Sequence, residues 1–540
     1  MLGIKFDNLR GDLFGGLTAG VVALPLALAF GEASGAGPIA GLYGAIIVGF
    51  FAALFGGTGS QISGPTGPMI VVFAGVFGAL SGNPGLVFAT VVLAGVIQVA
   101  FGIFKLGQYI KLVPYPVVSG FMTGIGCIII ALQASRLFGH EPEGSGTIPA
   151  LTAIPGAVLD PNWVALGLGL LTLIIVFTWP AKMAKIVPPP LAALVIGTLL
   201  STIIAGAPLL GDIPTGLPSF IIPEFRAETI VIVVEAAFVL ALLGSLDSLL
   251  TSLVADNMTR TKHNSNQELI GQGIGNVFAG FFGGIPGAGA TMRTVVNIRT
   301  GGLTKISGMI HSALLFAVVV SLGPLAAQIP HAVLAGILVK VGYDIVDLAY
   351  LKRAHKGPRW DLMLMVLVLI LTVFVDLITA VIAGVVLASL AFVKQMADLQ
   401  LASIKDLEED LDQLIPSEEE EILKDVADSV TLFDFNGPLS FGAAADLGHH
   451  VRLKAKGSSA LVIDFLQVPF LDVSAARAVA TICQDATEAK KRVFISGMNS
   501  KVKQVLIALQ EDSVLPEMFY ENRKDALEAT RKFILAAQKN

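Results

Sequence analysis

Apolar residues occupy long blocks up to about residue 395, and Gly, Pro and short polar turns separate the blocks. A helix that crosses a bilayer needs about 20 mainly apolar residues. Two of the blocks, 64–80 and 290–298, are short or interrupted by Gly and Pro, so neither is expected to cross the membrane as a full helix. The pattern predicts fourteen helical segments, at residues 12–30, 37–56, 64–80, 86–104, 113–135, 162–179, 189–206, 229–253, 267–283, 290–298, 305–325, 330–346, 361–376 and 378–394.

The pattern changes after residue 395. An acidic stretch with helical periodicity predicts a solvated connector over 396–428, and 429–540 alternates short apolar runs with amphipathic ones. The runs predict strands at 430–435, 460–465 and 492–495 and helices at 474–487 and 500–510, which is typical of a small α/β domain. Ser474 falls at a predicted helix start, where it is either a plain N-cap or a regulatory phosphoacceptor or ligand-sensing position.

Composition supports this division. The chain has 540 residues, of which 54% are hydrophobic and 14% charged. Charged residues make up about 9% of residues 1–395 and about 28% of residues 396–540, against about 25% in an average soluble domain. An ordinary soluble enzyme is therefore excluded, and the net charge of −6 gives no sign of nucleic-acid binding. No Gly-rich phosphate loop, metal-ligand cluster or nucleophile triad is visible, so no enzymatic activity is expected.

The loops between the segments alternate in charge. Lys and Arg mark cytoplasmic loops, and with a basic N-terminus inside, every second loop is basic. This alternation predicts that both termini are cytoplasmic. The basic loops contain Lys105 and Lys111, Lys182 and Lys185, Arg260 and Lys262, Arg299 and Lys305, and Lys352 to Arg359; the intervening loops contain Glu141, Glu143, Asp212, Glu224 and Glu228.

A short motif occurs twice. Residues 51–57 (FAALFGG) recur as residues 278–284 (FAGFFGG), and a Gly/Pro-rich stretch follows each copy. The first stretch opens the third apolar segment and the second opens the tenth, so the repeat contains seven segments. An odd number of crossings places the two halves in opposite orientations. The repeat therefore predicts the inverted architecture of many secondary transporters.

Irregular backbone at membrane depth must be buried in protein or line a cavity. The free N–H groups and dipole of a helix that starts there attract an anion. We therefore predict a small-anion cradle made from the backbone N–H groups of Gly289, Ala290 and Thr291, with Thr66 opposite. Arg293 either contacts the anion or pairs with a carboxylate. The alternative is a structural re-entrant turn that binds no ligand.

Asp247 lies deep in the eighth segment, and ionisable residues at such positions are functional candidates. Thr251 is four residues further on and shares its helix face. A carboxylate, a hydroxyl and backbone carbonyls are the hard oxygen ligands that Na⁺ needs, which makes Na⁺ the expected coupling ion. A lone buried carboxylate could equally bind a proton.

Three stretches carry a resemblance to a known family. Residues 11–25 (GDLFGGLTAGVVALP), the Gly64–Pro68 turn and the tail motif at 464–475 resemble the SulP anion permeases. Within that family, residues 251–276 are similar to its sodium-dependent bicarbonate transporters. The resemblance implies a 7+7 inverted repeat with core and gate domains, a cytoplasmic STAS domain that often forms a homodimer contact, and a bacterial inner membrane location.

The resemblance also implies roles for individual residues. Asp247, Thr251, Gly289 and Thr291 match a sodium site, and Thr66, Ala290 and Thr291 match bicarbonate contacts. Asp at 247, where many relatives have Glu, favours the sodium-coupled branch. Arg293 instead resembles the arginine of other SulP members, which keeps sulfate, dicarboxylate or chloride open, with proton coupling or exchange. The sequence thus predicts a secondary transporter, with Na⁺-coupled bicarbonate uptake first; an uncoupled anion channel and a membrane-bound sensor are the other hypotheses.

Overall fold

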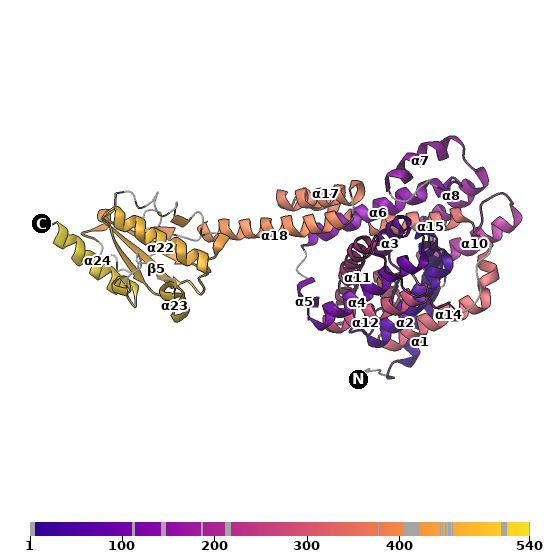
Figure 1. The fold of residues 1–540 in the computed structure, drawn as a ribbon, viewed down its shortest axis with the longest axis horizontal. Helices are drawn as coiled ribbons and strands as arrows, with labels where there is room; N and C mark the ends of the chain where they lie inside the picture. The colour runs from indigo at the N-terminus through magenta and orange to yellow at the C-terminus, as the bar shows by residue number, and fades with distance from the viewer. Residues whose placement is uncertain are drawn as a thin grey trace. The chain divides into compact units, whose positions relative to one another are not determined.

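The computed structural model divides the chain into two compact units, Met1–Val386 and Leu387–Asn540. The first unit is helical, and the second contains a sheet with helices packed on it (Figure 1). The structure describes residues 6–80, 82–110, 114–141, 147–184, 187–210, 218–375, 377–402, 405–406, 419, 421–422, 424–442, 444, 447–448, 451, 455, 457–508 and 516–538.

Each of the fourteen predicted apolar segments contains a helix. The main helices are α1 (Leu9–Ala33), α2 (Pro38–Phe55), α3 (Gly67–Ala79), α4 (Pro84–Ile103), α6 (Tyr115–Leu137), α7 (Thr147–Leu159), α8 (Trp163–Thr178), α10 (Pro189–Ile203), α11 (Ile230–Thr259), α12 (Ser265–Phe281), α13 (Thr291–Arg299), α14 (Lys305–Ala326), α15 (His331–Ile345), α17 (Arg359–Phe374) and α18 (Leu377–Ala402); α5 (Gly107–Ile110), α9 (Ala181–Ala184) and α16 (Leu348–Ala354) are short.

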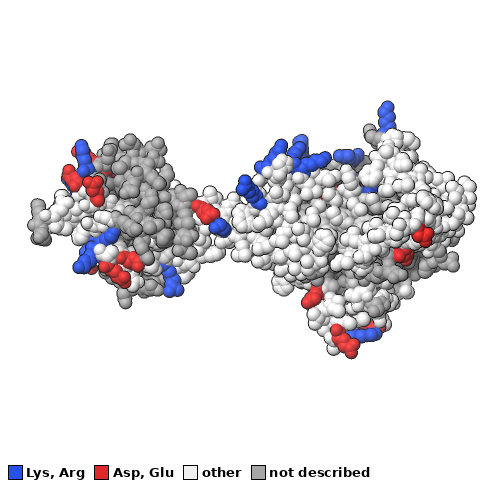
Figure 2. Space-filling view, turned by 90° about the horizontal axis from the view of Figure 1, so that it is seen from above, with Lys and Arg blue, Asp and Glu red and all other residues white. Residues whose placement is uncertain are grey.

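Six of the described helices are long and apolar enough to cross a membrane, and the pair α7 and α8, bent by 114°, makes a seventh if it is one span. Helix α7 was not predicted. Large apolar side chains such as Ile103, Ile174 and Ile203 are exposed on the first unit. Figure 2 shows broad uncharged surface there, with Lys and Arg gathered along one edge. This surface is typical of a protein embedded in lipid.

The helices of the first unit form two groups. Helices α1, α2, α4, α11, α12, α13 and α14 pack on one another, and so do α6, α7, α8, α10, α15 and α17. Helix α3 packs on α11 of the first group and on α6 of the second, and α1 packs on α10 and α15. Figure 1 shows α7, α8, α10 and α15 together at one side. The two groups therefore meet along α1, α3, α6, α10 and α15.

Glycine allows a very close contact between α4 and α12. A Cβ atom on Gly95 would lie 2.6 Å from the carbonyl oxygen of Gly273, and one on Gly273 would lie 2.5 Å from the carbonyl oxygen of Gly95. Only a residue without a side chain permits such an approach, as in other membrane helix pairs. The glycines in these apolar segments thus have a packing role.

The repeated motif meets its own copy inside the first unit. The rings of Phe51 and Phe278, which hold the same place in the two copies, stack with centroids 4.3 Å apart. Further on, strands β1 (Ser63–Gly64) and β2 (Ala288–Gly289) pair antiparallel, with Ser63 opposite Gly289. A two-fold axis brings equivalent segments together in this antiparallel manner. The contacts agree with an inverted repeat.

The second unit contains a four-stranded sheet in the order β3-β4-β5-β6. Strands β4 (Val430–Asn436), β5 (Ala460–Gln467) and β6 (Arg492–Ser496) are parallel. Helices α22 (Val473–Glu488) and α23 (Ser500–Ala508) contribute to one core cluster, and α24 (Arg523–Ala537) contributes to another. The predicted strands and helices are therefore present, each to within a few residues.

The predicted connector at 396–428 needs a correction. Helix α18 continues to Ala402, and β3 (Lys405–Asp406) pairs antiparallel with β4. At the start of the acidic stretch, the chain therefore pairs with the sheet edge, where the sequence had predicted a solvated helix. Residues 407–418 of that stretch lie outside the described residues.

Candidate functional site

Two half-helices start where the paired strands end. Thr66 is the N-cap of α3 and has extended backbone (φ −128°, ψ 156°), and Thr291 is the first residue of α13, after the cap residue Ala290. The N–H groups of a first helical turn have no acceptor within the helix, and the dipole makes that end positive. Thr66 and Thr291 therefore lie at the starts of the two half-helices, as the sequence predicted.

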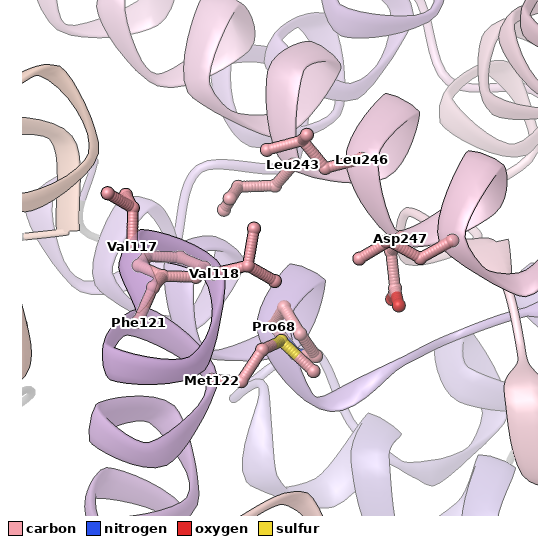
Figure 3. A pocket seen from close by; sticks show the side chains of 9 residues that line it. Pro68, Val117, Val118, Phe121, Met122, Leu243, Leu246 and Asp247 are labelled. Carbon is pink, nitrogen blue, oxygen red and sulfur yellow. The ribbon is translucent and has the colours of Figure 1, made fainter. Parts of the chain in front are cut away.

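Asp247 lies on α11 beside the start of α3. The Asp247 carboxylate and the Thr66 hydroxyl are both buried and interact with each other, and neither Asp247 Oδ2 nor the Thr66 hydroxyl oxygen has a further hydrogen-bond partner among the described residues. Figure 3 shows Asp247 from α11, Pro68 from α3 and Met122 from α6 around a small cavity of about 30 Å³. A buried carboxylate with so few partners is costly in apolar surroundings, so this position favours a bound ion. The lining is otherwise apolar: Pro68, Val117, Val118, Phe121, Met122, Leu243, Leu246 and Leu250.

Thr251, one helical turn after Asp247, connects α11 to β2 and α13. Its hydroxyl donates to the carbonyl oxygen of Gly289 at 3.0 Å and lies 2.7 Å from the hydroxyl oxygen of Thr291. The Thr251 side chain is fully buried. One carbonyl and two hydroxyl oxygens therefore converge on the helix face that also carries Asp247. Unwound backbone carbonyls of this kind bind Na⁺ in transporters, so the donor set fits that ion.

The predicted anion cradle needs a correction at two positions. The N–H of Gly289 donates to the Ser248 hydroxyl at 3.0 Å, and the N–H of Ala290 donates to the carbonyl oxygen of Ile62 at 2.8 Å. Both groups are used to hold the strands, so neither is available to an anion in this conformation. The donors left for an anion are those in the first turns of α3 and α13, with the Thr66 hydroxyl.

Arg293 stabilises the loop that enters α3. Its guanidinium is buried and donates from Nη2 to the carbonyl oxygen of Pro65 at 2.6 Å. No ion pair between Arg293 and Asp247 is found in the described part of the chain. The charges of Arg293 and Asp247 nevertheless interact without direct contact, which agrees with the predicted pairing with a carboxylate, and contact with the anion stays a prediction. The structure places a positive charge next to both half-helix starts.

Sequence reasoning missed Glu268 on α12. Its fully buried carboxylate accepts the N–H groups of Gly57 and Thr58 at 2.9 Å and the side-chain amides of Gln61 and Gln272 at 2.8 Å. These bonds fix the loop that leads into β1.

Asn276 lies on the same face of α12. Its side-chain amide accepts the N–H of Gly287 at 2.8 Å and donates to the carbonyl oxygen of Gly287 at 3.0 Å. The signal was present, because Glu268, Gln272 and Asn276 follow one another at four-residue spacing in an otherwise apolar segment.

Two larger cavities approach the ion site from opposite ends. One, of about 440 Å³, is lined by Tyr115, Asp347 and neighbouring residues, and it shares Val118 and Met122 with the Asp247 cavity. The other, of about 450 Å³, is separated from Gly67 by a pocket of only about 10 Å³. The Asp247 cavity therefore shares part of its lining with the first of these cavities, and a small pocket lies between the second cavity and the start of α3.

In the second unit, Asp472 and not Ser474 caps α22. The Asp472 carboxylate accepts the N–H groups of Ala475 and Phe441, each at 2.8 Å. Ser474 is the second helical residue and is exposed. The N-cap interpretation of Ser474 is therefore wrong, and its hydroxyl faces solvent.

These features define a class. A helical membrane unit with two opposed half-helices, joined to a small α/β domain, is a transporter architecture built from inverted repeats. The chain belongs to the sulfate permease family (SulP), whose sequence model matches residues 9–368, and the STAS domain model matches residues 421–526. The 7+7 repeat is typical of this family.

The relatives include proteins named as transporters. The bicarbonate transporter BicA of Synechocystis sp. is 45% identical over 534 residues, which cover 97% of this chain and 94% of that protein. The putative sulfate transporter YvdB of Bacillus subtilis is 33% identical over 517 residues, covering 93% and 94% of the two chains.

Solved structures show the same fold. The transmembrane domain of a cyanobacterial bicarbonate transporter BicA is 51% identical with a TM-score of 0.67, and the match covers 70% of this chain and 98% of that one. The inward-facing murine solute carrier 26 member A9 anion transporter has a TM-score of 0.82 at 20% identity, covering 99% of this chain and 92% of that one. The second likeness extends the fold agreement over the STAS domain.

Proposed function

We propose that this protein is a secondary active transporter that takes up bicarbonate together with Na⁺. The observation that carries the proposal is the buried Asp247 carboxylate, which interacts with the Thr66 hydroxyl and keeps an oxygen free to bind an ion. A carboxylate at the bilayer centre costs about 2.5–3.5 kcal/mol on insertion scales. A Na⁺ ion held by Asp247, Thr251, Thr291 and the Gly289 carbonyl offsets this cost. The similarity to BicA supports bicarbonate as the anion.

The geometry provides a reason for coupling. The cation ligands on α11 and β2 adjoin the starts of α3 and α13, where an anion is attracted. Thr291 belongs to both sets. A bound Na⁺ raises the affinity for the anion, and the anion raises the affinity for Na⁺ by the same factor. Each ion therefore favours the transport of the other.

Sulfate is the second candidate anion, and one observation favours it. The buried guanidinium of Arg293, next to two positive half-helix ends, suits a divalent anion better than a neutral site would. The similarity to a putative sulfate transporter points the same way. Bicarbonate remains first because the similarity to BicA is higher and covers nearly the whole chain.

The protein is a polytopic membrane protein of this family, and we place it in the bacterial plasma membrane with both termini in the cytoplasm. We divide the chain into a transport domain (1–395), a segment (396–428) that contains the end of α18 and strand β3, and a STAS domain (429–540), and we assign a homodimer contact to the STAS domain. The basic loops, including Lys352 to Arg359, then lie on the cytoplasmic side. The wide cavity beside Tyr115 and Asp347 opens to the cytoplasm in this assignment.

The test is uptake of radiolabelled bicarbonate and of radiolabelled sulfate into proteoliposomes that contain the full chain. An inward Na⁺ gradient should drive bicarbonate uptake, and Asp247→Asn should abolish it. Glu235→Gln is the matched control, because Glu235 is an exposed carboxylate on the same helix. Uptake of sulfate alone would show that the anion is wrong. Bicarbonate uptake that ignores Na⁺ and follows a pH gradient would show proton coupling instead.

A further inference from the structure

Three ligand-type side chains from distant parts of the chain meet at one end of the membrane unit. They are Glu32 near the end of α1, Glu141 after α6 and His331 at the start of α15, and their ligand atoms all lie within 4.8 Å of one another. Nδ1 of His331 is 3.1 Å from an oxygen of Glu32 and 3.8 Å from an oxygen of Glu141. Helix α1 belongs to the first helix group, and α6 and α15 belong to the second.

The orientation of His331 places a positive charge, either a proton or a metal ion, between its Nδ1 atom and the carboxylates. Its Nε2 atom lies 3.1 Å from the carbonyl oxygen of Leu209. A carbonyl only accepts, so Nε2 carries the hydrogen. The Nδ1 atom of His331 is buried and faces the Glu32 carboxylate, to which a protonated histidine donates and toward which a neutral histidine presents a lone pair. A lone pair that faces two carboxylates is unfavourable unless a positive charge lies there.

We propose that Glu32, Glu141 and His331 form a Zn²⁺ site. Zinc binds His nitrogen and carboxylate oxygen at about 2.0–2.2 Å in a tetrahedron, which sets neighbouring ligand atoms about 3.3 Å apart. The separations of 3.1 and 3.8 Å lie on either side of this value. Metal-binding histidines commonly donate their other N–H to a backbone carbonyl, as His331 does to Leu209. Glu141 is exposed, which leaves the fourth position to water.

The site has a consequence for transport that rests on the proposed function. Alternating access requires one helix group to move against the other around the ion site. A metal that binds Glu32 on one group and Glu141 and His331 on the other links the groups and opposes this movement. In the proposed topology these residues face the outside. External Zn²⁺ is therefore an inhibitor that holds the transporter closed on that side.

Zinc binding is measured first, without reference to transport. Purified full-length protein is titrated with Zn²⁺ in a calorimeter, and we expect one site per chain. His331→Ala and Glu32→Gln should each weaken binding at least tenfold. His355→Ala is the matched control, since His355 is an exposed histidine elsewhere. Glu141→Gln changes an exposed side chain, which should not impair folding, and should also weaken binding. The site would be overturned if the wild-type protein does not bind Zn²⁺, or if the His331→Ala and Glu141→Gln variants bind it as tightly as the wild type. His331 would then simply be protonated.

Inhibition is measured second, in proteoliposomes with Zn²⁺ outside. Uptake by the wild type should fall at least tenfold at saturating Zn²⁺, and uptake by Glu141→Gln should not. Zinc that binds through these residues but leaves uptake unchanged would overturn the proposed link between the helix groups. An absence of any anion uptake would refute the proposed function instead, and the calorimetric result would stand apart from it.

Discussion

Thr251→Val is the sharpest perturbation of the candidate cation site. Valine has nearly the same shape as threonine but no hydroxyl. The change removes the bond to the Gly289 carbonyl at 3.0 Å and the 2.7 Å contact with the Thr291 hydroxyl, all within a fully buried environment. An unsatisfied buried carbonyl costs about 1–3 kcal/mol. When the hydroxyl is also a Na⁺ ligand, a loss of this size corresponds to about a 5- to 150-fold weaker Na⁺ affinity.

The assay is the Na⁺ concentration that gives half-maximal bicarbonate uptake in proteoliposomes. Thr251→Val should raise this concentration about 5- to 150-fold, and Thr251→Ser, which keeps the hydroxyl, should stay near the wild type. Elution as a single peak in size-exclusion chromatography checks that both variants fold. A Thr251→Val protein that is folded and active, with an unchanged Na⁺ dependence, would refute the assignment of Thr251 to the cation site.

Further predictions concern the Asp247 carboxylate, the Cys483 thiol and the boundary between the two units. Asp247→Asn should abolish Na⁺ dependence and most uptake, whereas Asp247→Glu should retain anion uptake with weaker selectivity for Na⁺ over Li⁺; uptake assays with each cation measure both. Burial raises the pKa of the Cys483 thiol to about 12, so its reactive thiolate forms only near that pH, and in a Cys127→Ser variant maleimide should label it at neutral pH only after unfolding. Truncation after residue 402 should leave a folded membrane unit with a smaller oligomer, and light scattering with chromatography would contradict this if the protein aggregates or keeps its oligomeric state.

The pattern of apolar residues located most of the helices because a helix that crosses lipid needs about 20 mainly apolar residues. The half-helix starts at Thr66 and Thr291 were also visible, since Gly and Pro precede both. Helix α7 was missed; its sequence contains Pro149, Pro155 and Gly156, residue types that interrupt helical patterns. The pairing of β1 with β2 involves only two residues in each strand, too few for any pattern to show.

The site was predictable in its residue types but not in its hydrogen bonds. Asp247 and Thr251 could be placed on one helix face by their spacing alone. The N–H groups of Gly289 and Ala290 were expected to be free, and only the three-dimensional arrangement shows that Ser248 and Ile62 accept them. The cluster of Glu32, Glu141 and His331 joins residues almost 300 positions apart. Such contacts depend on how the two helix groups pack, which local sequence does not determine.

The central claim is that Na⁺ and the anion cross the membrane together. The most direct measurement is uptake of ²²Na⁺ into proteoliposomes with and without an inward bicarbonate gradient, at fixed pH and membrane potential. Coupling is reciprocal, so bicarbonate should accelerate ²²Na⁺ entry in the wild type and leave it unchanged in Asp247→Asn. Entry of ²²Na⁺ that is the same with and without bicarbonate in the wild type would contradict the account.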